Sequence, residues 1–134
     1  MSSRKLDDLS QSVKEAALKH IALCNDKGVE LLIYCTLRSN DEQNELYSIG
    51  RDKPGKIVTN ARSGQSAHNP DINGKSHAYD CCPMIGGKPI WDSKHPSWII
   101  VGQCGEDAGL VWSGRWTGKL KETAHFQDKN WIKK

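Results

Sequence analysis

The apolar residues near the N-terminus change their spacing at Gly28, and this change limits the possible folds more than any other feature. Before it, apolar side chains recur every three or four residues, as on one face of a helix; they are Leu6, Leu9, Val13, Ala17, Ile21 and Cys24. Gly28 suits the left-handed conformation that ends many helices. The run that follows is apolar and typical of a buried strand. The sequence therefore predicts a helix over 4–27 and a strand over 29–35.

Further helical and extended segments alternate along the rest of the chain. Ser39 and Glu42 form a capping-box pattern, which predicts a second helix that ends at Gly50. A third helix is expected to be capped by Ser93, with Pro96 near its first turn and Gly109 after its end. Strands are expected over 78–84, 88–91, 110–112 and 124–127. The composition of residues 51–76 predicts a long loop, and residues 113–121 connect the last two strands.

The length and composition fit one ordinary globular domain. The chain has 134 residues, of which 37% are hydrophobic and 26% charged, and it shows no internal repeat. We therefore expect a single domain over residues 1–134 of the α+β class, with helices packed on a small central antiparallel sheet.

The charge pattern argues against nucleic-acid binding and membrane insertion. The formal charge is +3, and no Lys/Arg run is long enough for a nucleic-acid arm. No signal peptide or transmembrane stretch is visible. We expect a monomer made in the cytoplasm, which another protein must release if its target lies outside.

The five cysteines are Cys24, Cys35, Cys81, Cys82 and Cys104. The count is odd, and no Cys-x-x-Cys pair is present. Neighbouring Cys81 and Cys82 would project to opposite sides of a strand, so they are poor joint metal ligands. We interpret the cysteines as reduced thiols that mostly fill the core.

A possible metal site is formed by His68, Asp80 and His125. Catalytic zinc needs three protein ligands and one open position. Asp80 lies inside an apolar strand pattern, where a carboxylate is costly unless it is paired or metal-bound. Glu122 precedes His125 by three residues and could accept a proton. Each residue also has an ordinary structural explanation, so spacing alone leaves the site open.

The residues around these positions resemble a zinc peptidase family that includes phage L-alanyl-D-glutamate endolysins, D-alanyl-D-alanine carboxypeptidases and dipeptidases, and the hedgehog domain. The family pattern is Ser-x-His-x-x-Gly-x-Ala-x-Asp, followed later by Glu or Asp, two residues, then His. The matching segments are Ser66-Ala67-His68, Ala78-Tyr79-Asp80 and Glu122-Thr123-Ala124-His125. The resemblance implies a hedgehog-like fold, Zn2+ held by His68, Asp80 and His125, and Glu122 as catalytic base.

Other blocks extend the resemblance to roughly residues 29–127. Residues 34–39, which end in Arg38-Ser39, resemble the family's strand before its second helix. Arg38 is therefore expected to stabilise the oxyanion or to hold a substrate carboxylate, although an arginine at a strand end is ordinarily a surface residue. Ser66 is expected to contact substrate or to orient the His68 loop. Trp116 is expected to contact substrate.

One departure from the family lies between the first two ligands. His68 and Asp80 are twelve positions apart, where the family pattern has seven, so five residues are extra. The family glycine position falls on Ser76. A loop insertion costs little free energy, because closure entropy grows slowly with length. His77 is a rival first ligand, but Ser66 accompanies His68 and favours it.

The resemblance implies a peptidoglycan peptidase, and the lack of an export signal favours a phage endolysin. Such an enzyme cuts the L-alanyl-D-glutamate bond of the wall stem peptide, which lyses the host after a separate membrane-permeabilising protein releases it. The alternatives are a D-alanyl-D-alanine carboxypeptidase or dipeptidase, and a non-catalytic zinc-binding domain. Glu122 argues against the non-catalytic alternative, because a structural site needs no base. A small His-metal nuclease is disfavoured, because no basic stripe is present.

Overall fold

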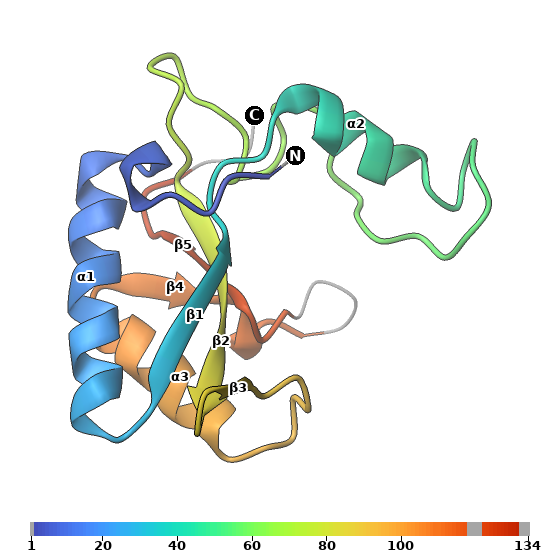
Figure 1. Cartoon of the computed structure of the whole chain (residues 1–134). Helices are drawn as coiled ribbons and strands as arrows, with labels where there is room; N and C mark the ends of the chain where they lie inside the picture. The colour runs from blue at the N-terminus through green and yellow to red at the C-terminus, as the bar shows by residue number, and fades with distance from the viewer. Residues whose placement is uncertain (1, 118–121, 132–134) are drawn as a thin grey trace.

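The computed structural model describes residues 2–117 and 122–131, and it has helices on one side of an antiparallel sheet. The helices α1 (Gln11–Asp26) and α3 (Ser97–Asp107) pack together on that side, while α2 (Asn40–Ser48) projects away from the sheet (Figure 1). Within the described residues, no helix is long and apolar enough to cross a bilayer.

The sheet is antiparallel throughout. Its strands, in spatial order, are β1 (Glu30–Cys35), β2 (Ala78–Ile85), β5 (His125–Asp128) and β4 (Leu110–Trp112), and β3 (Lys88–Pro89) also pairs with β2. A 3-10 turn over Ser113–Arg115 follows β4. The predicted α+β class and the long loop between α2 and β2 are confirmed. The predicted connection over 113–121 lies partly outside the described residues.

Helix α1 begins at Gln11, so the prediction of a start at residue 4 was wrong. Leu6–Asp8 form a short 3-10 turn instead. The amide of Ser10 donates to the carbonyl of Ser76, and the amide of Ser76 donates to the carbonyl of Asp8, each at 2.8 Å. These bonds hold the chain extended before the helix, because a backbone group paired to a distant segment cannot join the helical ladder.

The prediction that Ser93 caps the third helix was also wrong. The oxygens of Asp92 accept hydrogen bonds from the amides of Lys94 and His95, which close a separate turn. Pro96 then takes the N-cap position, and α3 begins at Ser97. The predicted end is correct, since Gly109 follows α3 with a φ of +98°.

The core lies between the helices and one face of the sheet. The rings of Tyr79 and Trp112 lie 5.9 and 6.4 Å from the ring of Phe126. Successive side chains of a strand point to opposite faces. Asp80 and His125, the neighbours of Tyr79 and Phe126, therefore project from the face away from α1 and α3.

Candidate active site

The site is built on one row of residues that crosses three strands. Asp80 of β2 lies opposite His125 of β5 in register, and Cys35 of β1 lies opposite Asp80 on its other side. Residues directly opposite each other in an antiparallel pair have neighbouring side chains. His68 joins them from the long loop, where its carbonyl accepts a hydrogen bond from the amide of Arg38 at 2.9 Å.

Polar atoms of His68, Asp80 and His125 converge. Nε2 of His68 lies 3.1 Å from Oδ1 of Asp80 and 3.2 Å from Nδ1 of His125. Nδ1 of His125 lies 3.3 Å from the same carboxylate oxygen. Both histidines are buried. The structure thus brings together the three residues that the sequence predicts as metal ligands.

Hydrogen bonds on the far side of each imidazole fix which nitrogen faces the site. Nδ1 of His68 donates to the carbonyl of Thr36, and Nε2 of His125 donates to Oε1 of Gln127, each at 2.8 Å. When both imidazoles are neutral, the facing nitrogens carry lone pairs, which repel at 3.2 Å unless a positive charge lies between them, either a proton on His68 or a metal ion. Two nitrogens at 2.0–2.1 Å from a tetrahedral zinc ion are about 3.3 Å apart. The donors therefore fit Zn2+.

The electrostatics of the site also favour a cation. Burial alone would raise the pKa of Asp80, but the charge of His68 and hydrogen bonds from both histidines hold that pKa well below its usual range. Burial opposes a charge on His68, and the attraction to Asp80 outweighs it and raises the pKa of His68. The carboxylate is thus ionised, and its charge is balanced by protonated His68 or by a metal ion that replaces that proton.

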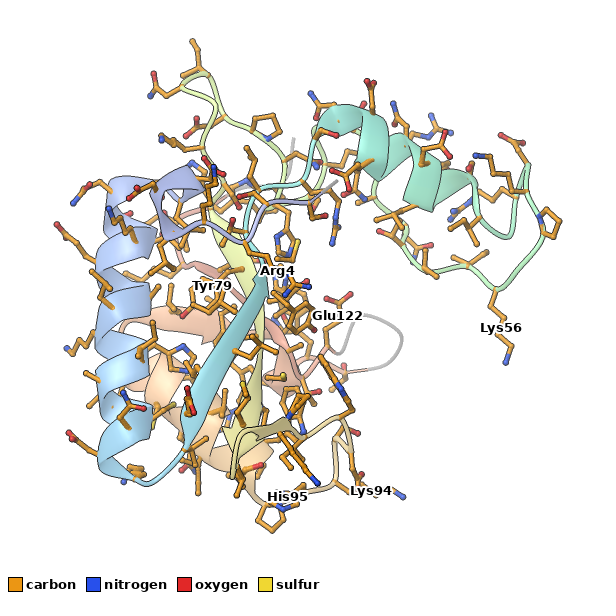
Figure 2. All side chains as sticks on the ribbon, in the orientation of Figure 1. Arg4, Lys56, Tyr79, Lys94, His95 and Glu122 are labelled. Atoms are coloured by element: carbon orange, nitrogen blue, oxygen red, sulfur yellow. The ribbon has the colours of Figure 1, made fainter. Side chains whose placement is uncertain are left out.

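Glu122 and Arg38 border the converging atoms. Oε2 of Glu122 lies 3.9 Å from Nδ1 of His125, and the side chain is exposed on the side of the sheet away from α1 (Figure 2). Nη2 of Arg38 lies 3.9 Å from Oδ2 of Asp80. Nη1 of Arg38 donates to Oε1 of the buried Gln43 at 3.1 Å, which holds the guanidinium in place.

Ser66 and Trp116 lie next to two of the histidines. Oγ of Ser66 accepts a hydrogen bond from the amide of His68 at 3.2 Å, which orients the loop. Ser66 lines a cavity of about 280 Å³ that is separate from the cleft beside Asp80. The ring of Trp116 lies 6.1 Å from the ring of His125. Substrate contacts of both residues stay predictions.

His77 takes part in a different set of contacts. Its Nε2 lies 2.8 Å from Oδ2 of Asp71, and its Nδ1 lies 3.6 Å from Oδ2 of Asp128. His77 precedes Asp80 by three positions, so the alternation of β2 directs it away from Asp80. The enlarged loop thus provides Asp71 as the hydrogen-bond partner of His77. His68 is the histidine that contacts Asp80 and His125.

A cleft of about 560 Å³ opens beside the site. It reaches from Asp80 past Tyr34 and Cys35 to Glu45 and Lys53 beyond the start of α2. Sequence reasoning interpreted the cleft residue Cys35 as a core thiol, and it gave no role to Tyr34, Gln43 or Gln127. Only Gln127 carried a usable signal, because it follows His125 by two positions on one strand face.

Comparisons with known proteins identify relatives of this chain. No protein-family model matches the chain. The chain is 34% identical over 128 residues to the peptidoglycan L-alanyl-D-glutamate endopeptidase CwlK of Bacillus subtilis (strain 168), covering 90% of this chain and 73% of that relative.

Two solved structures share the fold. The L-Ala D-Glu endopeptidase ChiX of Serratia marcescens has a TM-score of 0.60 at 21% identity, covering 96% of this chain and 89% of that one. The LD-carboxypeptidase LdcB has a TM-score of 0.61 at 19% identity, covering 96% and 74%. The sequence match to CwlK shows that the chain belongs to the family of hedgehog-like peptidases that includes peptidoglycan L-alanyl-D-glutamate endopeptidases, and the two solved structures have the same fold.

Proposed function

We propose that this chain is a zinc-dependent endopeptidase that hydrolyses the L-alanyl-D-glutamate bond of the peptidoglycan stem peptide. One observation supports the metal site: a ring nitrogen of His68, a ring nitrogen of His125 and a carboxylate oxygen of Asp80 lie within 3.3 Å of one another. The names of CwlK and ChiX support the choice of bond.

The residues around the metal ligands have separate roles in this proposal. A bound Zn2+ polarises the scissile carbonyl and lowers the pKa of the attacking water. Glu122 accepts the proton of that water and passes it to the leaving amine. The guanidinium of Arg38 stabilises the negative charge that develops on the carbonyl oxygen. Ser66 holds the His68 loop in place, and Trp116 contacts the substrate beside His125.

The biological role that we propose is host lysis by a phage endolysin. The protein would act as a monomer on the wall, after a separate membrane-permeabilising protein lets it out of the cytoplasm. A terminal D-alanine carboxypeptidase is the second candidate, because the fold matches the LD-carboxypeptidase LdcB as well as it matches ChiX.

Digestion of purified muropeptides, followed by mass spectrometry, tests the proposal. Cleavage after L-alanine releases a peptide that begins with D-glutamate, and a chelator should stop this reaction until Zn2+ is restored. Release of D-alanine alone would replace the proposed bond with that of the carboxypeptidase. Activity that is unchanged after complete metal removal would contradict the zinc mechanism.

A further inference from the structure

An irregularity in β1 turns the side chain of Tyr34 toward the site. The pairing with β2 shifts register between Ile33 and Cys35, so Tyr34 has no partner of its own on β2. In a regular strand, Tyr34 and Cys35 would point to opposite faces of the sheet. The register shift instead lets both side chains line the cleft beside Asp80. Bulges next to active sites often redirect a side chain in this way, so Tyr34 is a candidate for contact with substrate.

The ring of Tyr34 is supported by a neighbour, while its hydroxyl is unpaired. The ring of Trp91 lies 5.5 Å from it in an edge-on arrangement, which is a favourable geometry for two aromatic rings. Within residues 2–117 and 122–131, no group forms a hydrogen bond with the hydroxyl of Tyr34. Burial, together with the negative charge of Asp80, raises the pKa of Tyr34, so the hydroxyl keeps its proton at neutral pH. The cleft therefore contains a positioned hydrogen-bond donor that has no acceptor.

The charges along the cleft fit the glutamyl half of the substrate better than the alanyl half. Charged side chains line the cleft from Asp80 outward; they belong to Arg38, Glu42, Glu45, Lys53 and Asp80. The alanyl half has no charged side chain. A glutamyl residue has one more carboxyl group than the peptide chain uses, so the leaving half carries a free carboxylate, or its amide, a few bonds from the scissile nitrogen. A carboxylate is a strong acceptor for a neutral hydroxyl.

We propose that the hydroxyl of Tyr34 donates a hydrogen bond to the free carboxylate of the D-glutamyl residue, and that this contact makes the carboxylate a better substrate than its amide. This inference rests on the proposed function, in which the L-alanyl-D-glutamate bond is cut. A hydrogen bond to an ionised acceptor is stronger than one to a neutral acceptor, so the amide binds more weakly. Tyr34 thus determines specificity, while Glu122 and Arg38 act at the scissile bond.

Steady-state kinetics with two synthetic stem peptides test this contact. The peptides differ only in whether the free glutamyl carboxyl group is ionised or amidated. Tyr34→Phe keeps the ring that lies beside Trp91 and removes only the hydroxyl. Tyr47→Phe is the matched control, because the ring of Tyr47 lies under Arg51 and Arg62 and is not part of the cleft lining.

The parent and Tyr47→Phe should both prefer the carboxylate peptide. In Tyr34→Phe, the KM for the carboxylate peptide should rise about 10- to 100-fold, as expected for the loss of a hydrogen bond to a charged group. The KM for the amidated peptide should change much less, so the preference shrinks. A fall in kcat with an unchanged preference would place the hydroxyl at the reacting carbonyl and overturn the proposed contact. Equal losses for the two peptides, or no loss, would overturn it as well.

Direct binding separates this inference from the proposed function. The leaving-half peptide, which begins with D-glutamate, is titrated into the protein with and without added Zn2+, once as the carboxylate and once as the amide. Tyr34→Phe should bind the carboxylate form more weakly than the parent and the amide form about equally well. This difference supports the role of Tyr34 even if the parent cuts neither stem peptide, an outcome that would overturn the proposed function alone. Equal binding by parent and variant, or no binding by the parent, would overturn the inference.

Discussion

The geometry of the site depends on a few hydrogen bonds that surround the predicted ligands. The carbonyl of Thr36 and the side chain of Gln127 orient the two imidazoles, each at 2.8 Å. Partners of this kind fix the tautomer of a metal-binding histidine. The ligand types could be predicted from the sequence, and Gln127 follows His125 on the same strand, whereas the contact of His68 with Thr36 depends on how the end of β1 and the loop approach each other.

Glu122→Gln should remove the proposed base and leave the metal in place. The amide keeps the size of the side chain but cannot accept the proton, so kcat should fall about 10²- to 10⁴-fold. Zinc content should not change, because Glu122 is exposed and its oxygen is 3.9 Å from the nearest histidine nitrogen. Glu15→Gln, on the exposed face of α1, is the control. Wild-type turnover in Glu122→Gln, measured on muropeptides, would refute the assignment.

Arg38→Lys tests whether a guanidinium is needed at the cleft. Lysine keeps the charge but loses the planar fork that bonds to Gln43 and faces Asp80. Removal of one oxyanion donor typically lowers kcat by about 10² to 10³. The same change at Arg51, which lies over the ring of Tyr47, should leave the rate unchanged. Equal rates for both variants would remove Arg38 from the mechanism.

At the scale of whole elements, local patterns predicted most of the fold. The capping box is present, since Oγ of Ser39 accepts a hydrogen bond from the amide of Glu42. The start of α1 could not be predicted, because it is set by pairing between Leu9 and Ser76, which are far apart in sequence. The contact of His68 with Asp80 and His125 likewise depends on strand register and on the path of the loop. Local periodicity does not predict this contact, whereas the family resemblance did.

His20 joins three elements and should make stability depend on pH. From α1, Nδ1 of His20 accepts from the hydroxyl of Tyr79 in β2, and Nε2 donates to the carbonyl of Val101 in α3. Burial lowers the pKa of His20 to about 4. Between about pH 6.5 and 4 the unfolded chain binds this proton and the folded protein does not, so stability falls as the pH falls, by about 3 kcal/mol in total.

Urea unfolding of His20→Gln in the presence of chelator measures this contribution. The variant should be less stable than the parent at pH 7, because glutamine fits the buried site imperfectly. Between pH 7 and 5 the difference from the parent should shrink by about 2 kcal/mol, since the variant lacks the titrating group. A difference that stays constant over that range would mean that His20 keeps its ordinary pKa in the folded protein.

On the scale of the molecule, a bound metal ion would link the long loop to the central strands of the sheet, because it has ligands from both. His68 belongs to the loop, whereas Asp80 and His125 belong to paired strands. An ion bound only by the folded chain stabilises it by about 2.7 kcal/mol at a concentration a hundred times Kd. For a domain of this size, that corresponds to a rise in Tm of about 10 °C.

His68→Ala and His77→Ala should differ in this zinc response. His68 meets Asp80 and His125, so its loss should remove most of the rise in Tm and reduce zinc content to near zero. His77 bonds to Asp71 instead, so His77→Ala should have a lower Tm without zinc but the full rise on adding it. Thermal unfolding with zinc and with chelator gives each shift as a difference within one variant, which cancels the cost of the substitution itself. If His77→Ala lost the response and His68→Ala kept it, the enlarged loop would have moved the first ligand to His77.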